Sequence, residues 1–205
     1  MKRSRLSATA RPTSLAGSSS MGLVNERWST TSMVLHWASV ALIVGLATAG
    51  FVMTDLPPDS SLRLLLSRLH TVSGLTLMLL TVSRLAVRWR GKSPAPLPLA
   101  PLHRRGVSVV HALLYAAMFA LGASGFLTGV RSTWPDYLRG ELAMAPELER
   151  LASRQVHEVL VFVLLSLIAL HVGGVLVQEL RCGAALRRMV PFLSRSPSSP
   201  EREVP

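Results

Sequence analysis

Four long stretches of this chain carry no charged side chain, and they constrain its fold more than any other feature. A helix needs about 20 apolar residues to cross a bilayer, and three of the stretches reach that length unaided. The remaining one becomes long enough only if a helix tolerates Arg84 and continues to Val87. The sequence therefore predicts an all-α integral membrane protein with a bundle of four transmembrane helices. The stretches are residues 28–54, 69–83, 106–130 and 159–178.

The composition supports a membrane protein and argues against two other classes. Of the 205 residues, 49% are hydrophobic and 16% are charged, and the mean hydropathy is +0.40. The single cysteine, Cys182, excludes a disulfide framework and a four-cysteine metal site. A net charge of +11 would indicate a nucleic-acid partner in a soluble protein. Here the basic residues lie between the apolar stretches, so we expect the bilayer and no nucleic acid as partner.

The distribution of basic residues predicts the orientation in the membrane. Five Lys or Arg residues lie before the first stretch, five between the second and third, and five after the fourth. The other two connections contain fewer basic residues and also most of the acidic ones. The positive-inside rule then places both termini and the proline-rich linker SPAPLPLAP in the cytoplasm.

The chain divides into three predicted parts. Residues 1–26 are basic and serine-rich and lack the apolar core of a secretory signal, so we expect a disordered extension. An organelle transit peptide, or translation starting at Met21, are alternatives. Residues 27–191 are predicted to form the membrane domain, and residues 192–205 a disordered tail. We also predict a short surface helix over residues 146–155, on the outer side.

Histidines gather in the predicted spans, and their depth sorts them into pairs. His103 falls in the polar linker and is expected to be solvated. By orientation and position, His36 and His171 lie toward the inner face, and His70 and His157 toward the outer face. His157 and His171 are 14 residues apart, about 21 Å and nearly four turns, so they point the same way. A single membrane histidine is ordinarily hydrogen-bonded to a neighbouring helix, but five within the spans are too many for that explanation.

Two facing histidines at each of two depths can clamp two planar cofactors, and haem iron commonly takes axial histidines. The sequence therefore predicts two haems inside the bundle. Propionates need cations, and Arg68, Arg84 and Arg154 lie near the histidine levels. Arg84 is the most informative, because an arginine inside a membrane helix requires a partner. The candidate cofactor-binding residues are His36, His70, His157, His171 and Arg84. The candidate glycines that would make room for a macrocycle are Gly74, Gly122, Gly125, Gly173 and Gly174.

A zinc or copper site is the metal alternative. Such sites usually add carboxylates or thiolates at one depth, whereas here the acidic residues lie in loops apart from Glu158 and the histidines form two separated pairs. His111 lies at roughly the inner level, and we expect it to hydrogen-bond a propionate or a quinone. With both axial positions filled by histidine, the expected chemistry is outer-sphere electron transfer.

Several motifs resemble the bacterial cytochrome b-561 family, four-helix di-haem membrane cytochromes related to the cytochrome b subunits of hydrogenases. The resemblance covers residues 27–191 and implies two b-type haems. In that family helices 1 and 2 each give one axial histidine and helix 4 gives two. These fall on His36, His70, His157 and His171. The motifs are RWSTTSMVLHW, RLHTVSG, VSRLAVRWR, VVHALLY, VHEVL and ALHVGG.

The resemblance implies a protein that carries electrons across the membrane and exchanges them with quinone. Three alternatives stay open. One is a stand-alone oxidoreductase passing electrons from superoxide to quinone, with Arg68 and Arg154 drawing the anion to the outer haem. Another is the membrane-anchor subunit of a dehydrogenase or hydrogenase, with a redox partner protein. The third is a small transporter or scaffold without redox chemistry.

Overall fold

The computed structural model describes residues 27–91, 101–182 and 186–190, so the predictions for residues 1–26 and 192–205 lie outside the described residues. The described residues are helical and contain no strand, which confirms the predicted all-α class. In chain order the helices are α1 (Thr30–Asp55), α2 (Ser61–Arg90), α3 (Pro101–Val130), α4 (Trp134–Arg139), α5 (Ala152–Cys182) and the 3-10 turn η1 (Leu186–Arg188).

The four long helices α1, α2, α3 and α5 are each long and apolar enough to cross a membrane, as predicted. Helix α2 continues through Arg84 to Arg90, so the arginine does sit inside a span. Helix α3 begins five residues before the predicted stretch, and His103 therefore lies in its first turn. The assignment of His103 to the linker was wrong, because Pro101 favours the first helical position and starts the helix there.

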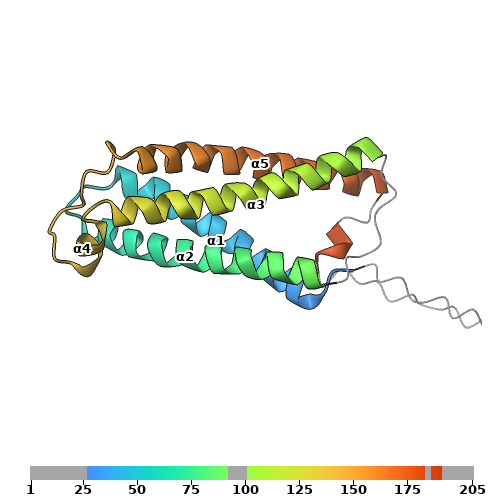
Figure 1. Ribbon diagram of the computed structural model, residues 1–205, viewed down its shortest axis with the longest axis horizontal. Coiled ribbons are helices and arrows are strands. Elements are labelled where there is room, and N and C mark those ends of the chain that lie inside the picture. Colours follow the sequence, from blue (N-terminus) through green and yellow to red (C-terminus); the bar gives the residue numbers. More distant parts are fainter. Residues whose placement is uncertain (1–26, 92–100, 183–185, 191–205) are drawn as a thin grey trace, which may run out of the picture.

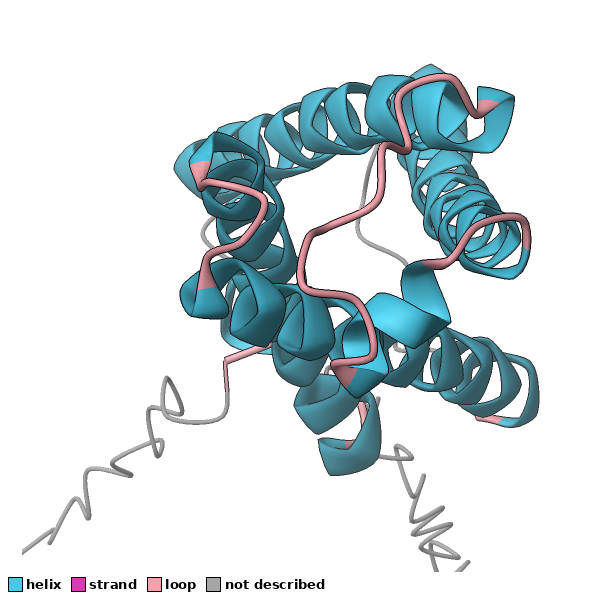
Figure 2. Ribbon diagram, turned by 90° about the vertical axis from the view of Figure 1, so that its left-hand side faces the viewer, coloured by secondary structure: helices cyan, strands magenta, loops and turns pink. Residues whose placement is uncertain are grey.

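The long helices lie side by side in an elongated bundle (Figures 1 and 2). Helix α1 packs on α2, α3 packs on α5, and α2 touches α3. The short helix α4 lies at the end of the bundle where α1 joins α2 (Figure 1), and it contacts both α2 and α3. By the predicted orientation this is the outer end.

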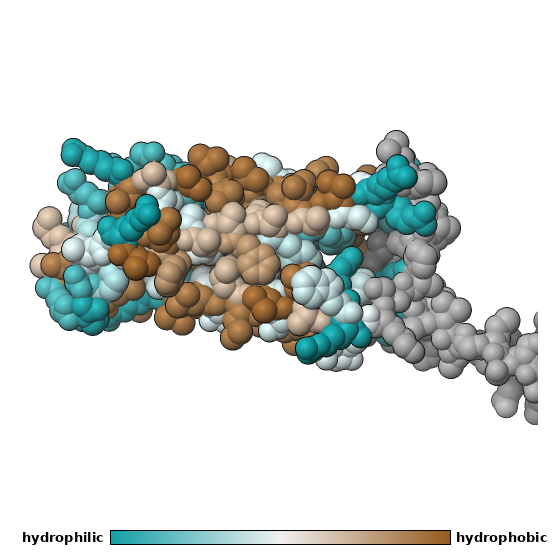
Figure 3. Space-filling view, viewed as in Figure 1, coloured by the Kyte–Doolittle hydropathy of each residue, from teal (hydrophilic) through white to brown (hydrophobic). Residues whose placement is uncertain are grey.

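Apolar side chains cover the outside of the bundle and form a hydrophobic band across its length, with polar residues at the ends (Figure 3). The interior holds small and hydroxyl-bearing side chains. In hydrocarbon each hydroxyl needs a partner, and a helix supplies one in the carbonyl a turn earlier. Ser39 donates to the carbonyl of Leu35 and Thr81 to that of Leu77, both at 2.7 Å. Small interior side chains also let membrane helices approach closely.

The predicted surface helix over residues 146–155 was wrong. Residues 141–151 are irregular, α5 begins at Ala152, and the short helix is α4, further upstream. Local stereochemistry explains the position. The Ser132 hydroxyl accepts the backbone N–H of Trp134 at 3.2 Å, and Pro135 occupies the first turn. Gly140 ends the helix with φ of 84°, a conformation that favours glycine.

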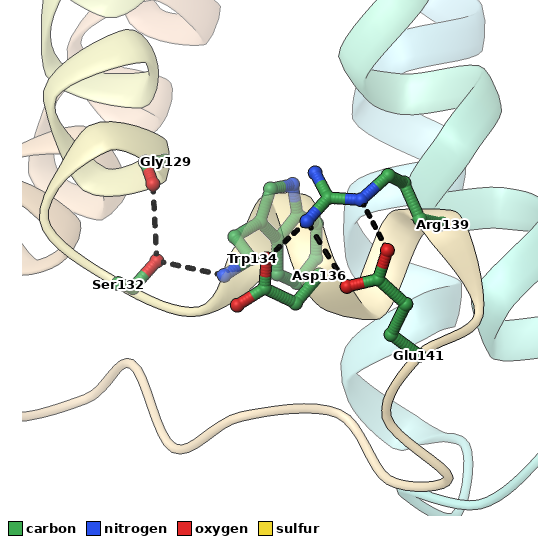
Figure 4. A network of polar contacts seen from close by, with 6 residues as sticks. All are labelled: Gly129, Ser132, Trp134, Asp136, Arg139 and Glu141. Atoms are coloured by element: carbon green, nitrogen blue, oxygen red, sulfur yellow. Dashed lines mark hydrogen bonds and ion pairs between the residues drawn. The ribbon is translucent and has the colours of Figure 1, made fainter.

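An ion-pair network closes the C-terminal end of α4 (Figure 4). The guanidinium of Arg139 pairs with the carboxylates of Asp136 and Glu141, and its Nε lies 2.7 Å from Glu141 Oε1. The hydrogen bond from Arg139 lowers the pKa of Glu141, and the same bond raises the pKa of Arg139. These side chains are exposed, so the network orients the loop more than it stabilises the fold.

At the other end, η1 and the residues after it fold back onto the start of α1. Trp37 Nε1 donates to the carbonyl of Met189 at 3.0 Å, and Arg27 donates to that of Val190 at 2.9 Å. The backbone N–H of Leu186 donates to the Glu179 carboxylate at 2.9 Å. These contacts join the two ends of the described chain at one face of the bundle.

Candidate haem site

His70 and His157 come together from helices that are distant in the chain. Their ring centres lie 6.3 Å apart, and the ring planes are inclined by 66°. Both rings are half-buried, one on α2 and the other on α5. The structure therefore brings together the two histidines that depth assigned to the outer level.

Backbone carbonyls hold both rings by the same nitrogen. The Nδ1 atom of His70 lies 3.1 Å from the carbonyl oxygen of Leu46, and Nδ1 of His157 lies 3.1 Å from that of Leu121. A carbonyl oxygen only accepts, so each Nδ1 carries the proton and each Nε2 keeps a free lone pair. This is the arrangement that orients metal-ligating histidines in proteins.

Glycines make room for these rings. A Cβ atom at Gly50 would lie 3.4 Å from Cε1 of His70, and one at Gly125 would lie 3.3 Å from Cε1 of His157. Each glycine follows its carbonyl, Leu46 or Leu121, by four residues. Gly125 therefore leaves room for a histidine ring, whereas the sequence prediction was that it leaves room for a macrocycle.

The other predicted glycines have varied surroundings. The side chain of Met78 fills the space beside Gly122, where a Cβ would overlap the sulfur. Gly74 faces the side chain of Leu46, and a Cβ at Gly173 or Gly174 would meet no atom within 4 Å. Sequence reasoning missed Gly50, which has the same role as Gly125.

A repeat in the sequence relates the two halves of the bundle and would have revealed these positions. The segment LATAGFV (46–52) in α1 matches LGASGFL (121–127) in α3, 75 positions later, and His36 and His111 have the same offset. Between α2 and α5 the offset is 87 positions, which relates His70 to His157 and Arg84 to His171. The outer histidine pair therefore joins equivalent positions of the two halves.

The inner level is arranged differently from the predicted pair. Arg84 lies 3.0 Å from Nδ1 of His36, while His171 contacts His111, with ring centres 5.0 Å apart. His36 and His111 occupy equivalent positions in the repeat, and so do Arg84 and His171, so the two contacts are equivalent. Among the described residues no ring contact joins His36 to His171, although the two lie within electrostatic range. The structure thus gathers the inner residues but does not pair the two histidines.

Arg84 is half-buried beside these histidines and stacks over the ring of Tyr115, 5.7 Å from its centre. Within the described part of the chain it forms no ion pair with an acidic side chain. A cation inside the membrane without an acidic partner is costly. The inner level therefore offers a positive charge to an anionic group.

The two outer arginines have different roles. Arg68 donates from Nε to the carbonyl of Leu138 at 2.7 Å, so it fastens α4 to α2. Arg154 pairs with Glu158 at 3.2 Å and lies close enough to His70 and His157 to act on both electrostatically. Of the two, Arg154 is the cation available to the outer pair.

The outer residues fit a haem iron. A metal held about 2 Å from each of two imidazole nitrogens places the ring centres roughly 6 Å apart, and the observed 6.3 Å agrees with this. A hollow of about 430 Å³ opens beside His70 between α1 and α2, and its lining contains no residue of α5. In the described residues, no group of three or more His, Cys, Asp or Glu side chains is arranged to hold a metal ion. The outer donors are a pair of histidines, a ligand set that haem iron can take.

Two buried donors among the described residues lack a hydrogen-bond partner, the hydroxyl of Tyr137 and the amide nitrogen of Gln178. Leaving such a group unsatisfied costs about 1–3 kcal/mol. Buried polar groups without a protein partner commonly face a bound water, ion or ligand.

A four-helix membrane bundle with a carbonyl-tethered histidine pair has the architecture of a membrane b-type cytochrome. The chain belongs to the prokaryotic cytochrome b561 family, which matches residues 27–192. This confirms the resemblance found in the sequence. The family gives the coarse function: the protein is a multi-pass membrane cytochrome of b type that transfers electrons.

Two relatives from Escherichia coli (strain K12) are similar to this chain. Cytochrome b561 homolog 2 is 34% identical over 105 residues, which cover 50% of this chain and 55% of the relative. Cytochrome b561 homolog 1 is 27% identical over 173 residues, 81% of this chain and 98% of the relative. The match to the first thus spans about half of that relative's length. No solved structure matches the chain.

Proposed function

We propose that this protein binds two haems b and carries electrons between the two faces of a bacterial inner membrane, exchanging them with quinone. His70 and His157 hold the outer haem, and His36 and His171 hold the inner one. The observation that carries the proposal is the outer pair. Both imidazoles keep Nε2 free for a metal because both Nδ1 atoms are committed to backbone carbonyls.

The protein's own residues fix the ligands. The backbone carbonyls of Leu46 and Leu121 orient the outer imidazoles. When bound, a haem supplies a one-electron iron couple. Two histidines per iron leave no open position for oxygen or substrate, so electron transfer at the haem edge is the expected activity.

The inner assignment requires Arg84 to release Nδ1 of His36. That nitrogen accepts from the guanidinium here, which places the imidazole proton on Nε2. A propionate is a better partner for Arg84 than a neutral imidazole, because charge-assisted bonds are the stronger ones. The proposal for the inner level rests on the family resemblance and on this chemistry.

The experiment that tests the proposal is a dithionite-reduced minus oxidised spectrum of the purified protein, followed by a pyridine haemochrome assay. We expect two low-spin haems b per chain. One haem or none in fully loaded protein would overturn the proposal, and a protein with no redox spectrum would be a transporter or scaffold.

Arg154 favours a second candidate, a stand-alone oxidoreductase that takes electrons from superoxide and delivers them to quinone. A cation near the outer pair speeds the approach of an anion, and salt weakens the effect. The rate of haem reduction by superoxide in a salt series, for the native protein and Arg154→Gln, tests it. Quinone reduction by protein purified without a partner separates this candidate from a membrane-anchor subunit.

A further inference from the structure

Two partnerless donors lie at opposite ends of the bundle. Tyr137 belongs to α4 at the outer end, and Gln178 lies near the C-terminal end of α5 at the inner end (Figure 1). Tyr137 is 1% exposed and Gln178 is 6% exposed, so neither polar group reaches solvent. They are the two such side-chain atoms among the described residues.

Tyr137 is held next to the outer histidine level. Its ring packs on Trp134, with centres 5.7 Å apart, and Trp134 Nε1 donates to the hydroxyl of Thr71 at 3.1 Å. Thr71 directly follows His70 in α2. Arg68 fastens the same short helix through the carbonyl of Leu138. Helix α4 is thus anchored beside His70, and the buried Tyr137 belongs to this helix.

Gln178 lies on the same helix as His171, toward the inner end of the bundle. It follows His171 by seven residues on α5, so it lies on the same face of the helix, about 10 Å nearer the inner end. The repeat-equivalent position of His171 on α2 is Arg84, which lies 3.0 Å from His36 and forms no ion pair with an acidic side chain of the described residues. A cation therefore lies at the inner histidine level, and Arg154 acts electrostatically on the outer pair.

We infer that these donors bind haem propionates: the Tyr137 hydroxyl donates to a carboxylate of the outer haem, and the Gln178 amide donates to a carboxylate of the inner haem. An ionised carboxylate only accepts hydrogen bonds and has room for several, so it satisfies a cation and a neutral donor together. Because the two donors lie at opposite ends of the bundle, each haem would have its own donor. The inference rests on the two haems of the proposed function.

Redox titration of the full-length holoprotein tests the inference. Losing a donor leaves the propionate more negative, which favours oxidised iron. Tyr137→Phe should therefore lower the midpoint potential of the outer component alone, defined as the one lost in His157→Ala. Gln178→Leu should lower that of the inner component alone. The chain offers one matched control for each, because it has two tyrosines and two glutamines. Tyr115→Phe should leave the outer potential unchanged, and Gln155→Leu should leave both unchanged.

Infrared redox difference spectra with ¹³C-labelled haem propionates give a second readout, which a purely structural role would not move. A carboxylate band should shift in Tyr137→Phe and another in Gln178→Leu. If a variant loses its haem, two measurements decide instead. In native protein with ring-labelled tyrosine, the C–O band that persists in Tyr115→Phe should respond to haem reduction. Gln178→Glu should lower the inner potential through like charge.

Unchanged potentials and carboxylate bands in both variants would overturn the inference while leaving the two haems in place. A tyrosine C–O band that does not respond to haem reduction would overturn the inference for the outer site. An unchanged inner potential in Gln178→Glu would overturn it for the inner site. Native protein without two redox components would instead refute the proposed function. The two failures are therefore distinguishable.

Discussion

A hydrogen bond from Nδ1 to a backbone carbonyl determines which nitrogen of each outer histidine can bind a metal. An imidazole has two nitrogens, and a hydrogen bond to a carbonyl decides which one remains a ligand. His70 and His157 both have this bond, whereas Nδ1 of His36 accepts from Arg84. His111 donates from Nδ1 to the carbonyl of Val107 in its own helix, at 2.8 Å. His36 is thus chemically distinct from the other three histidines although the sequence presents them alike.

Replacing either outer histidine should remove the same haem. We expect His70→Ala and His157→Ala to lose one common component of the reduced-minus-oxidised spectrum and to keep the other, because each removes one axial ligand. His36→Ala and His171→Ala should each lose the second component and keep the first. His111→Ala is the matched control, and loss of a whole haem in that variant would show that the inner ligands are misassigned.

Arg84→Leu should lower the midpoint potential of the inner haem, because a nearby cation stabilises the more electron-rich reduced state. A unit charge about 10 Å away contributes roughly 1–2 kcal/mol at an effective dielectric constant near 20, so we expect a fall of tens of millivolts. Redox titration measures it. Arg90→Leu, at the exposed end of α2, is the control, and equal potentials in all three proteins would contradict a charge role for Arg84.

Helices α1 and α3 serve as platforms for the ligands on α2 and α5. A glycine four residues after a tethering carbonyl leaves a notch in which the histidine ring lies against the helix. Ser39 and Thr128 in the same helices donate to carbonyls of their own helix, which supplies the partner that a hydroxyl needs in hydrocarbon. The platform is therefore a property of the helix surface, repeated in the two halves.

Gly125→Val tests the notch. A Cβ at this position would lie 3.3 Å from the ring of His157, and the added methyl groups crowd it further. We expect the outer haem to be lost or its spectrum altered, while the inner one persists. Gly106→Val in the same helix is the control, since a Cβ there meets no atom within 4 Å. Spectra from purified protein decide, and an unchanged outer component in Gly125→Val would argue against the notch.

The two ends of the bundle differ in structure, which gives the bundle a direction in the membrane. Helix α4 covers one end, and the backbone contacts of η1 lie at the other (Figure 1). Few residues of the apolar windows are fully buried inside the bundle, at most 17% of any window. Lipid therefore forms much of the environment of the helices, and the ends face two different aqueous compartments.

A C-terminal fusion tests the direction. The excess of Lys and Arg predicts that the C-terminus is cytoplasmic, so a green fluorescent protein fused after Pro205 should fluoresce and an alkaline phosphatase fused there should be inactive. The same pair of reporters inserted after Ala143, in the loop beyond α4, should give the reverse result. Active phosphatase at the C-terminus would invert the assignment of outer and inner levels.

The sequence by itself predicted the four spans, and it predicted that His70 and His157 share one level of the bundle. Length, hydropathy and the 1.5 Å rise per residue are properties of a single helix and need no partner. They also placed Arg84 inside a membrane helix, where its need for a partner follows from charge alone.

Only the tertiary structure decided which residues meet. The Nδ1 hydrogen bonds of the outer histidines join different helices, and so do the contacts of Arg84 with His36 and of His111 with His171. The position of α4 over the outer level likewise depends on a contact with α2. Such contacts depend on the rotation of each helix about its axis. The packing of small side chains sets this rotation, and hydropathy does not encode it. The repeat between the two halves was present in the sequence, but its meaning emerged when equivalent carbonyls were found holding equivalent histidines.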